Sequence, residues 1–396
     1  MRPRTVLPKG KWEADRRAGM VAHRAREVDI SGIRRMFESA PPTAINLGLG
    51  EPNFEPPGTV LDAYCHAVRN GGNHYGPSAG LPALRQKIAE RYRAGAPETS
   101  RDNVIITAGG SEGLMATAFA LYDPGDEILV PDPGFVLYAP HARLLGAEPV
   151  AYALDEKRAF LPDIGSIERL VTARTRAIVV NSPSNPTGAV LPEKTVEEII
   201  ALAERHDLHI VSDEVYDQIV YDRPVTSFWG RTDRAVVVNS FSKTLAATGW
   251  RVGFLVAPRA LAVEINKMHY HIIACASTPA QSAVLAGLEG GLSSTRAMTR
   301  EFQARRAIVL RELARCPGVT CVPPAGAFYA FPRFSWPQTA TEAAQALLSR
   351  GLITTPGDAF GSRGARHLRI SFAASRTDLT RGLALLREYA QEASRA

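Results

Sequence analysis

Short apolar segments alternate with helical segments between residues 103 and 257, and no other feature of the sequence restricts the fold as much. The apolar segments are rich in valine and isoleucine, as expected for strands that are buried on both faces of a sheet. Strands separated by helices form a mostly parallel sheet flanked by helices, so we expect an α/β fold. The expected strands are 104–107, 127–130, 149–153, 177–181, 208–212, 235–239 and 253–257, and the helices between the earlier ones are 112–122, 135–146, 163–170 and 192–206.

The segments on either side of this region predict a second, smaller unit. Beyond residue 277 the pattern is that of long helices up to residue 315, and a smaller α+β region follows. We therefore expect a basic N-terminal arm (1–29), a small α+β domain (30–50 and 290–396) and a large domain that carries the sheet (51–289). Within these parts the sequence predicts further helices at 30–37, 58–70, 81–93 and from 377 onward, and strands at 327–331, 352–355 and 367–372.

The basic character of the chain is confined to its N-terminal arm. The 396 residues carry 46 basic and 40 acidic side chains, which gives a net charge of +6. Residues 1–35 hold ten basic and four acidic residues, so the remainder of the chain is neutral overall and no basic face for nucleic acid is indicated. A solvated tail is the simpler interpretation of the arm, and a tethering role stays open.

Hydropathy and cysteine spacing favour a soluble protein of a reducing compartment. No apolar run approaches the ~18 residues of a membrane span, and the N-terminus lacks the apolar region of a secretory signal. The four cysteines include no CxxC pair, which is usual for thiols in the cytoplasm. Hydrophobic residues make up 45% of the chain, enough for the cores of two domains. We therefore expect a cytoplasmic protein without a membrane or nucleic-acid partner.

The segment from Asn239 to Arg251 places a lysine among small and hydroxylated residues. An apolar strand leads into it, and Lys243 is one of only seven lysines in a chain with 39 arginines. Loss of hydration in such a setting lowers the pKa of an ammonium group and makes the free amine a nucleophile. An amine of this kind suits a Schiff base with a carbonyl cofactor, and pyridoxal phosphate is the commonest such cofactor. A lysine that extends from a loop into water explains the segment equally well.

Further polar signals lie at the carboxyl ends of predicted strands, where parallel sheets bind their ligands. Gly109, Gly110 and Ser111 follow the strand 104–107 and open a helix, whose backbone N–H groups and dipole suit a phosphate. On its own this signal is weak, because two glycines before a helix often form only a turn. The loop 181–188, rigid because of its two prolines, presents the Asn185 amide as a donor.

An acidic residue follows the apolar strand 208–212. Asp213 stands there with Tyr216 close by, and a carboxylate in so apolar a setting needs a cation or a metal as partner. The sequence has no HExxH or similar cluster, and His269 and His271 alone are too few ligands, so no metal is expected. The protonated nitrogen of a pyridine ring is the better partner. An amine, an acid, a phosphate cradle, and phenol and amide donors together predict a pyridoxal phosphate site.

The order of several motifs along the chain resembles that of the class I and II aminotransferases. The motifs are GEP (50–52), HYGPSAG (74–80), GGSEG (109–113), NSPSNPTG (181–188), DEVY (213–216), SFSK (240–243), TGWRVGF (248–254) and RISF (369–372). Within that family the chain most resembles the aspartate/aromatic aminotransferase branch of the fold-type I pyridoxal phosphate enzymes. The resemblance runs from about residue 30 to the C-terminus, is specific for the superfamily and says little about the substrate.

This resemblance implies roles for individual residues and places the cofactor in the large domain. Lys243 would carry the cofactor as an aldimine and move a proton at the substrate carbon, and Asp213 would keep the pyridine nitrogen protonated. Arg369 would clamp the substrate carboxylate through two N–H groups. The other implied contacts are Tyr216 and Asn185 at the ring oxygen, Phe135 on the ring face, Gly110, Ser111, Ser240 and Arg251 at the phosphate, and Gly50 and Asn185 beside the substrate.

Taken one at a time, several of these residues also have a purely structural interpretation. Tyr216 and Phe135 could be core residues, and Arg251 and Arg369 could belong to surface ion pairs. Only their combination favours a site.

The resemblance also implies a homodimer and a reaction. Tyr75 would reach the phosphate of a neighbouring subunit, so the two sites would be shared. The enzyme would move the amino group of an L-amino acid (aspartate, aromatic or a broader range) to a 2-oxo acid such as 2-oxoglutarate, in two half-reactions. Segment 266–280 contains no arginine, so a preference for dicarboxylates is not evident. A β-lyase or decarboxylase on the same fold is the alternative, and a DNA-binding regulator is disfavoured because the arm is too short for a helix-turn-helix.

Overall fold

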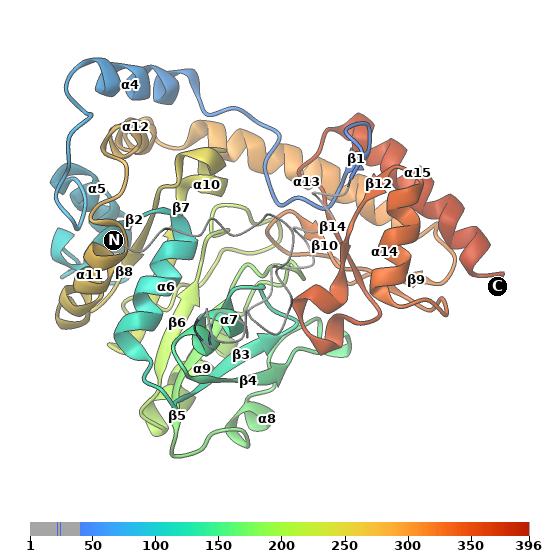
Figure 1. The fold of residues 1–396 in the computed structure, drawn as a ribbon, viewed down its shortest axis with the longest axis horizontal. Coiled ribbons are helices and arrows are strands. Elements are labelled where there is room, and N and C mark those ends of the chain that lie inside the picture. Colours follow the sequence, from blue (N-terminus) through green and yellow to red (C-terminus); the bar gives the residue numbers. More distant parts are fainter. Residues whose placement is uncertain (1–21, 23, 25–39, 396) are drawn as a thin grey trace, which may run out of the picture.

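The computed structural model describes residues 22, 24 and 40–395. The helix expected at 30–37 and nearly all of the expected arm fall outside the described residues. The described chain forms a central sheet with helices around it and a second group of helices and short strands beside it (Figure 1).

The predicted mostly parallel sheet is confirmed. Its strands are β2 (Val104–Thr107), β3 (Glu127–Asp132), β4 (Glu148–Ala153), β5 (Thr175–Asn181), β6 (His209–Asp213), β7 (Ala235–Ser240) and β8 (Gly253–Val256). They lie in the order β2-β8-β7-β6-β5-β3-β4, and β8 is the one strand of these seven that runs in the opposite direction to the other six. The chain between β7 and β8 holds no helix long enough to cross the sheet, so these two strands pair antiparallel. A strand pattern predicts burial and not direction, which is why this reversal was not expected.

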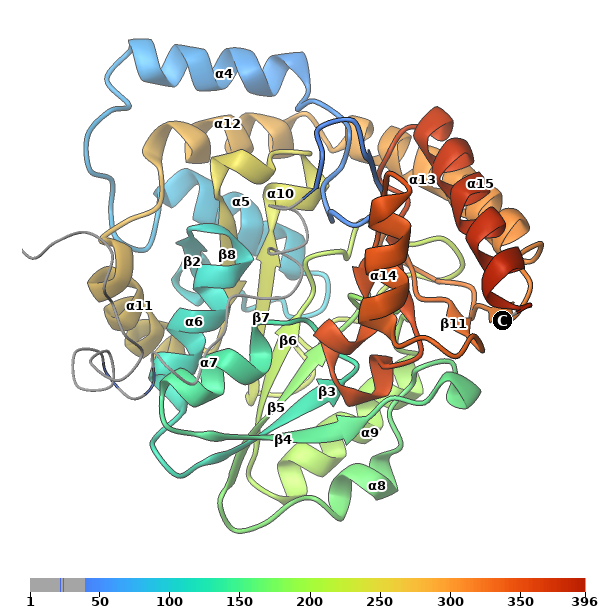
Figure 2. The ribbon, with the colours of Figure 1, turned by 45° about the vertical axis from the view of Figure 1, so that its right-hand side comes forward.

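Helices cover both faces of the sheet (Figure 2). The helices of this part are α4 (Gly58–Arg69), α5 (Pro82–Tyr92), α6 (Gly109–Leu121), α7 (Tyr138–Leu144), α8 (Ile164–Glu168), α9 (Glu193–Arg205), α10 (Phe241–Thr244), α11 (Arg259–Ile273) and α12 (Thr278–Glu289). The first face packs against α6, α7 and α11, and the second against α5, α8, α9 and α12. Consecutive residues of one strand enter different cores: Val236 and Val238 pack on the first face and Val237 on the second. This two-sided burial accounts for the continuous valine run.

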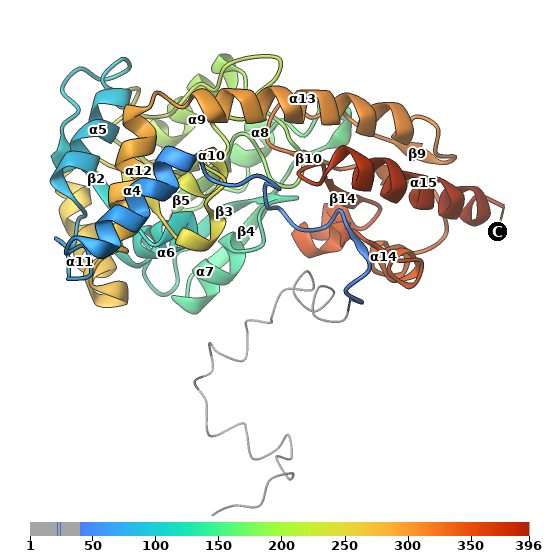
Figure 3. The same ribbon diagram turned by 90° about the horizontal axis from the view of Figure 1, so that it is seen from above.

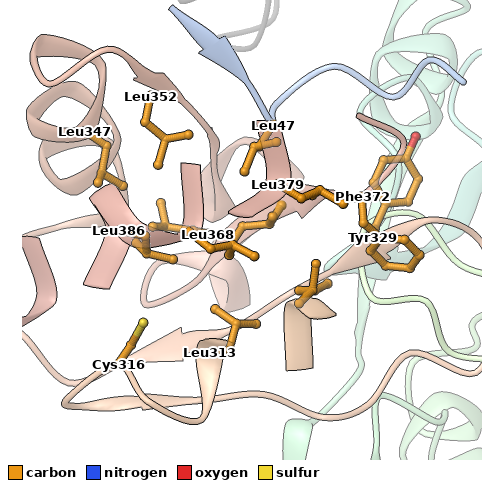
Figure 4. Packing of buried hydrophobic residues seen from close by; sticks show 14 of the residues in the cluster. Leu47, Leu313, Cys316, Tyr329, Leu347, Leu352, Leu368, Phe372, Leu379 and Leu386 are labelled. Atoms are coloured by element: carbon orange, nitrogen blue, oxygen red, sulfur yellow. The ribbon is translucent and has the colours of Figure 1, made fainter. Parts of the chain in front are cut away.

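A further hydrophobic core, separate from those on the two faces of the sheet, is formed mainly by C-terminal elements (Figure 4). Its elements are β1 (Ile45–Asn46), α13 (Ser293–Leu313), β9 (Val319–Thr320), β10 (Tyr329–Ala330), β11 (Arg333–Phe334), α14 (Ala340–Ser349), β12 (Leu352–Ile353), β13 (Thr355–Pro356), β14 (Leu368–Ser371) and α15 (Arg376–Ala393). The parallel pairing of β1 with β12 brings Leu47 into this core, where it packs with Leu352 and Leu379. Helix α13 extends from the sheet region along α15 (Figure 3). We propose this core as that of the small domain expected over 30–50 and 290–396.

Several element boundaries differ from the expected ones. Helix α6 begins at Gly109 and not at residue 112, and α10 and α11 were not predicted. The strand expected over 327–331 shrinks to Tyr329–Ala330, because Ala327 has a positive φ of 54° that a strand cannot contain. The strand expected over 352–355 divides into β12 and β13, which pair with different partners.

Among the described residues there is neither a membrane-spanning helix nor a cluster of metal ligands. None of their helices is long and apolar enough to cross a membrane. None of their histidine, cysteine and acidic side chains gather into a group of three or more that could hold a metal ion.

Candidate active site

A cavity of about 590 Å³ opens at the carboxyl ends of β5, β6 and β7. The core shown in Figure 4 also borders this cavity, because Tyr216, just beyond β6, packs into that core. All the site residues expected from the sequence line the cavity except Tyr75. They are Gly50, Gly110, Ser111, Phe135, Asn185, Asp213, Tyr216, Ser240, Lys243, Arg251 and Arg369.

The short helix α10 presents Lys243 to the cavity. The Ser240 hydroxyl caps this helix by accepting the backbone N–H of Ser242 at 3.1 Å. The Nζ of Lys243 donates to the Gly50 carbonyl at 2.6 Å. Burial lowers the pKa of Lys243 to about 8, against the opposing effect of Glu51. At pH 7 roughly a tenth of the amine is then unprotonated, far more than for an ordinary lysine.

Asp213, the last residue of β6, is buried beside neutral partners. Its Oδ2 accepts the Tyr138 hydroxyl at 2.7 Å, and its Oδ1 accepts the Val215 backbone N–H at 3.3 Å. Burial raises the pKa of Asp213 to about 6, and these two hydrogen bonds act in the opposite direction. A cationic ring nitrogen brought into the cavity would find here a carboxylate that lacks a charged partner among the described residues.

Arg369 on β14 is held rigidly against the cavity wall. Its Nη1 donates to the Asn185 side-chain oxygen at 2.9 Å, and its Nη2 donates to the Gly48 carbonyl at 2.5 Å. The guanidinium carbon lies 4.5 Å from the ring centroid of Tyr329 and 4.8 Å from that of Phe360. Its Nε is buried without a hydrogen-bond partner in the described structure. The side chain is therefore oriented in advance for an anion.

Gly109, Gly110 and Ser111 form the start of α6, and we call this segment the cradle. Its shape depends on glycine. Gly109 has a φ of +77°, and a Cβ there would lie 2.5 Å from Nη2 of Arg251, so the guanidinium approaches the backbone closely. Arg251 is fixed in turn, because its Nη1 donates to the Thr248 carbonyl at 2.9 Å. Gly110 and Ser111 line the cavity next to Ser240. Backbone N–H groups at a helix N-terminus, hydroxyls and a guanidinium form a donor set that fits a phosphate.

Two tyrosines and a phenylalanine complete the walls. The hydroxyls of Tyr216 and Tyr329 are hydrogen-bonded at 2.8 Å, and burial raises the pKa of Tyr216. Phe135 lines the cavity and meets Tyr138 edge-on, with ring centroids 5.7 Å apart.

Tyr75 lies elsewhere. Its side chain is 92% exposed, and it borders a shallow surface hollow together with residues 275–279.

Sequence reasoning missed Tyr138 and Tyr329. Tyr138 lies three residues after Phe135 in the helix expected over 135–146, and that spacing was an available signal for two neighbouring side chains. Tyr329 is 113 residues from Tyr216 along the chain, and no local pattern connects them.

Comparison with known proteins decides the family. The profile of "Aminotransferase class I and II" matches residues 42–385. The chain belongs to the class I and II aminotransferases. It is 38% identical over 376 residues to a probable aspartate aminotransferase of Methanocaldococcus jannaschii, covering 93% of this chain and 99% of the relative. It is 35% identical to an aromatic-amino-acid aminotransferase of Thermococcus litoralis, covering 89% of this chain and 94% of the relative.

The fold agrees with this assignment. The solved alanine aminotransferase of Pyrococcus furiosus superimposes with a TM-score of 0.88 at 34% identity, covering 94% of this chain and 100% of that one. The names of these relatives cover aspartate, aromatic and alanine aminotransferases, so they define the reaction class more closely than the substrate.

This aminotransferase is a pyridoxal phosphate-dependent transaminase that acts on amino acids and 2-oxo acids. The groups in the cavity fit the cofactor: an amine for its aldehyde, a buried carboxylate for its ring nitrogen, and the N-terminus of α6 with Arg251 for its phosphate. The family assignment favours amino transfer over the β-lyase and decarboxylase alternatives.

Proposed function

We propose that this aminotransferase passes the amino group of an L-amino acid to a 2-oxo acid such as 2-oxoglutarate, with Lys243 as proton carrier and Arg369 as carboxylate clamp. One observation carries the proposal. The Lys243 amine donates to the Gly50 carbonyl, and the Arg369 guanidinium donates to the Gly48 carbonyl two residues away. Both side chains therefore lie against the short segment 48–50. One α-amino acid bound there would have its reacting carbon near Lys243 and its carboxylate near Arg369.

The roles of the other residues follow from their chemistry. Bound pyridoxal phosphate supplies an electron-withdrawing ring that accepts the electron pair of the breaking Cα–H bond. Asp213 stabilises a proton on the ring nitrogen, because a buried carboxylate favours a neighbouring cation. Lys243 Nζ would take the proton from the substrate Cα, and a pKa lowered to about 8 by burial suits an amine that accepts a proton near neutral pH. Arg369 binds the α-carboxylate in a bidentate manner.

The apolar walls of the cavity support a broad range of substrates, which includes amino acids with apolar and aromatic side chains. Leu49, Leu114, Val136, Val215 and the Tyr329 ring line the cavity around the polar groups. Apolar walls of this kind stabilise a hydrophobic side chain through burial. Half-reactions with aspartate, phenylalanine and alanine, followed through the cofactor absorbance, test this range.

The test of the central proposal uses Lys243→Ala. The variant should keep the cofactor by its phosphate contacts, fail to be labelled by borohydride reduction and show no transamination. Labelling of a different lysine in the wild-type protein would overturn the assignment. Ammonia or CO₂ release at the rate of product formation would instead indicate elimination or decarboxylation.

We also propose a homodimer in which Tyr75 serves the site of the partner subunit. The loop that carries Tyr75 is fixed, because the Thr278 hydroxyl donates to the His74 carbonyl at 3.1 Å and the Gln281 side chain accepts the Leu81 N–H at 2.8 Å. A rigid loop that exposes 92% of a tyrosine suits a contact outside its own subunit. Mixed Lys243→Ala and Tyr75→Ala subunits should form hybrids in which one site is complete. If hybrids form and cofactor affinity does not recover, Tyr75 acts in its own subunit or not at all.

A cytoplasmic location is likewise our proposal. The four cysteines, Cys65, Cys275, Cys316 and Cys321, are free thiols, which suits a reducing compartment. Cell fractionation tests it.

A further inference from the structure

A fully buried histidine outside the cavity bridges two segments of the proposed site. His269 on α11 has no exposed surface. Its Nδ1 lies 3.0 Å from Oε1 of Glu112, and its Nε2 lies 2.9 Å from the carbonyl oxygen of Ser78. Glu112 directly follows Ser111 of the cradle, and Ser78 belongs to the loop that carries Tyr75. The proposed mechanism makes no use of this histidine.

The hydrogen-bond partners of His269 and Glu112 fix the number of protons that this pair carries. The Ser78 carbonyl can only accept, so Nε2 carries a hydrogen and donates it. Nδ1 faces a carboxylate oxygen, so a second proton lies between Nδ1 and Oε1 of Glu112. The other oxygen of Glu112, Oε2, accepts the Ala108 backbone N–H at 3.0 Å. His269 and Glu112 are therefore neutral as a unit.

The neutrality of this pair matters because of where Glu112 lies. Ala108 is the residue that precedes α6, so the Glu112 carboxylate lies at the N-terminus of the helix that carries Gly110 and Ser111. A negative charge at that terminus competes with a bound phosphate for the positive end of the helix dipole, and it also repels the phosphate. Glu112 nevertheless holds the Ala108 N–H and so fixes the start of the cradle.

We propose that His269 is a positioning residue for the cofactor phosphate. Its proton offsets the charge of Glu112, so that Glu112 fixes the cradle backbone without weakening the phosphate site. This inference rests on the proposed function, in which Gly110 and Ser111 bind the phosphate.

The test compares four proteins in which the charge of the His269–Glu112 pair differs. The pair is neutral in the wild type, negative in His269→Gln, and neutral again in Glu112→Gln and in the double variant. The probe is pyridoxamine 5′-phosphate, which has no aldehyde to react with Lys243, titrated into the cofactor-free full-length chain. His269→Gln should bind it about tenfold more weakly, the effect of one charge at a partly buried helix end. The double variant should return to within about twofold of the wild type, and Glu112→Gln alone should stay there, because both are neutral.

The outcomes separate charge from structure. If the pair acts only through packing, the double variant binds more weakly than either single variant, and that result overturns the inference. A weaker affinity of Glu112→Gln alone also overturns it, and this measurement remains available if His269→Gln fails to fold. His271→Gln, on the exposed side of the same helix, is the matched control and should bind as the wild type does. A wild-type protein that does not bind the probe would refute the proposed function itself.

Discussion

Replacement of Tyr138 by phenylalanine should make the stability of the protein more sensitive to pH. The change removes one hydroxyl, which donates to Oδ2 of the buried Asp213 at 2.7 Å. Burial raises the pKa of Asp213 to about 6, above its ordinary value, so the folded protein holds a proton that the unfolded chain has already released. The free energy of unfolding therefore falls as the pH rises from about 4 to the folded pKa.

The size of the effect follows from the charge on the acceptor. A hydrogen bond to a charged group contributes about 1.5–3 kcal/mol and one between neutral groups about 1 kcal/mol. Loss of the Tyr138 hydroxyl should therefore raise the pKa of Asp213 by roughly one unit, since one unit corresponds to about 1.4 kcal/mol. At pH 5 Asp213 is mostly protonated in both proteins, and the variant loses only about 1 kcal/mol. At pH 8 the loss should grow by a further ~1–2 kcal/mol.

The assay is urea unfolding of the cofactor-free protein at pH 5 and pH 8, at one protein concentration. Tyr152→Phe is the matched control, because the Tyr152 hydroxyl is buried too but donates to the neutral Val179 carbonyl at 2.8 Å. The control should lose the same free energy at both pH values. If Tyr138→Phe behaves like this control, the hydroxyl does not stabilise the Asp213 carboxylate and the reasoning fails.

Three further changes test other parts of the site. Arg369→Lys should reduce kcat/KM at least tenfold for every amino acid tested while cofactor affinity is kept, because lysine cannot form a bidentate pair; a loss confined to one substrate would contradict this. Gly50→Ala should nearly abolish turnover, because its Cβ would overlap the Tyr329 hydroxyl, and Tyr329→Phe in the same chain should restore part of it; no recovery would mean that the backbone, and not the clash, is at fault. Acylation of Lys243 in the cofactor-free protein, measured by mass spectrometry, should rise with an apparent pKa of about 8, because burial lowers the pKa of its ammonium group; a midpoint near that of an ordinary exposed lysine would refute the burial argument.

Much of the site could be predicted because its residues follow apolar strands. Asp213 ends β6 and Asn185 follows β5, and the carboxyl ends of parallel strands meet at one edge whatever the details of packing. The Tyr138–Asp213 contact could not be predicted in this way. It joins residues 75 positions apart and depends on how α7 packs against the sheet.

Prediction of the fold from the sequence is limited in the same way. Helix α11 was not predicted because its apolar residues are not confined to one side: Val263, Tyr270 and Ile272 are 57%, 55% and 39% exposed. A helix with exposed apolar residues gives a blurred periodicity. The burial of His269 on the same helix was also hidden, because its two partners come from distant segments.

The alternation of valines along β7 has a consequence for how the sequence of the protein can change during evolution. Val237 and Val238 are neighbours in the chain, yet different sets of helices pack against them. Substitutions at the two positions therefore disturb different sets of helices, and compensating changes should arise on one side of the sheet at a time. Each side can drift in composition while the backbone between them stays fixed. The strand ends that carry Asp213 and lead to Lys243 should therefore keep their spacing when residues on one face of the sheet are substituted.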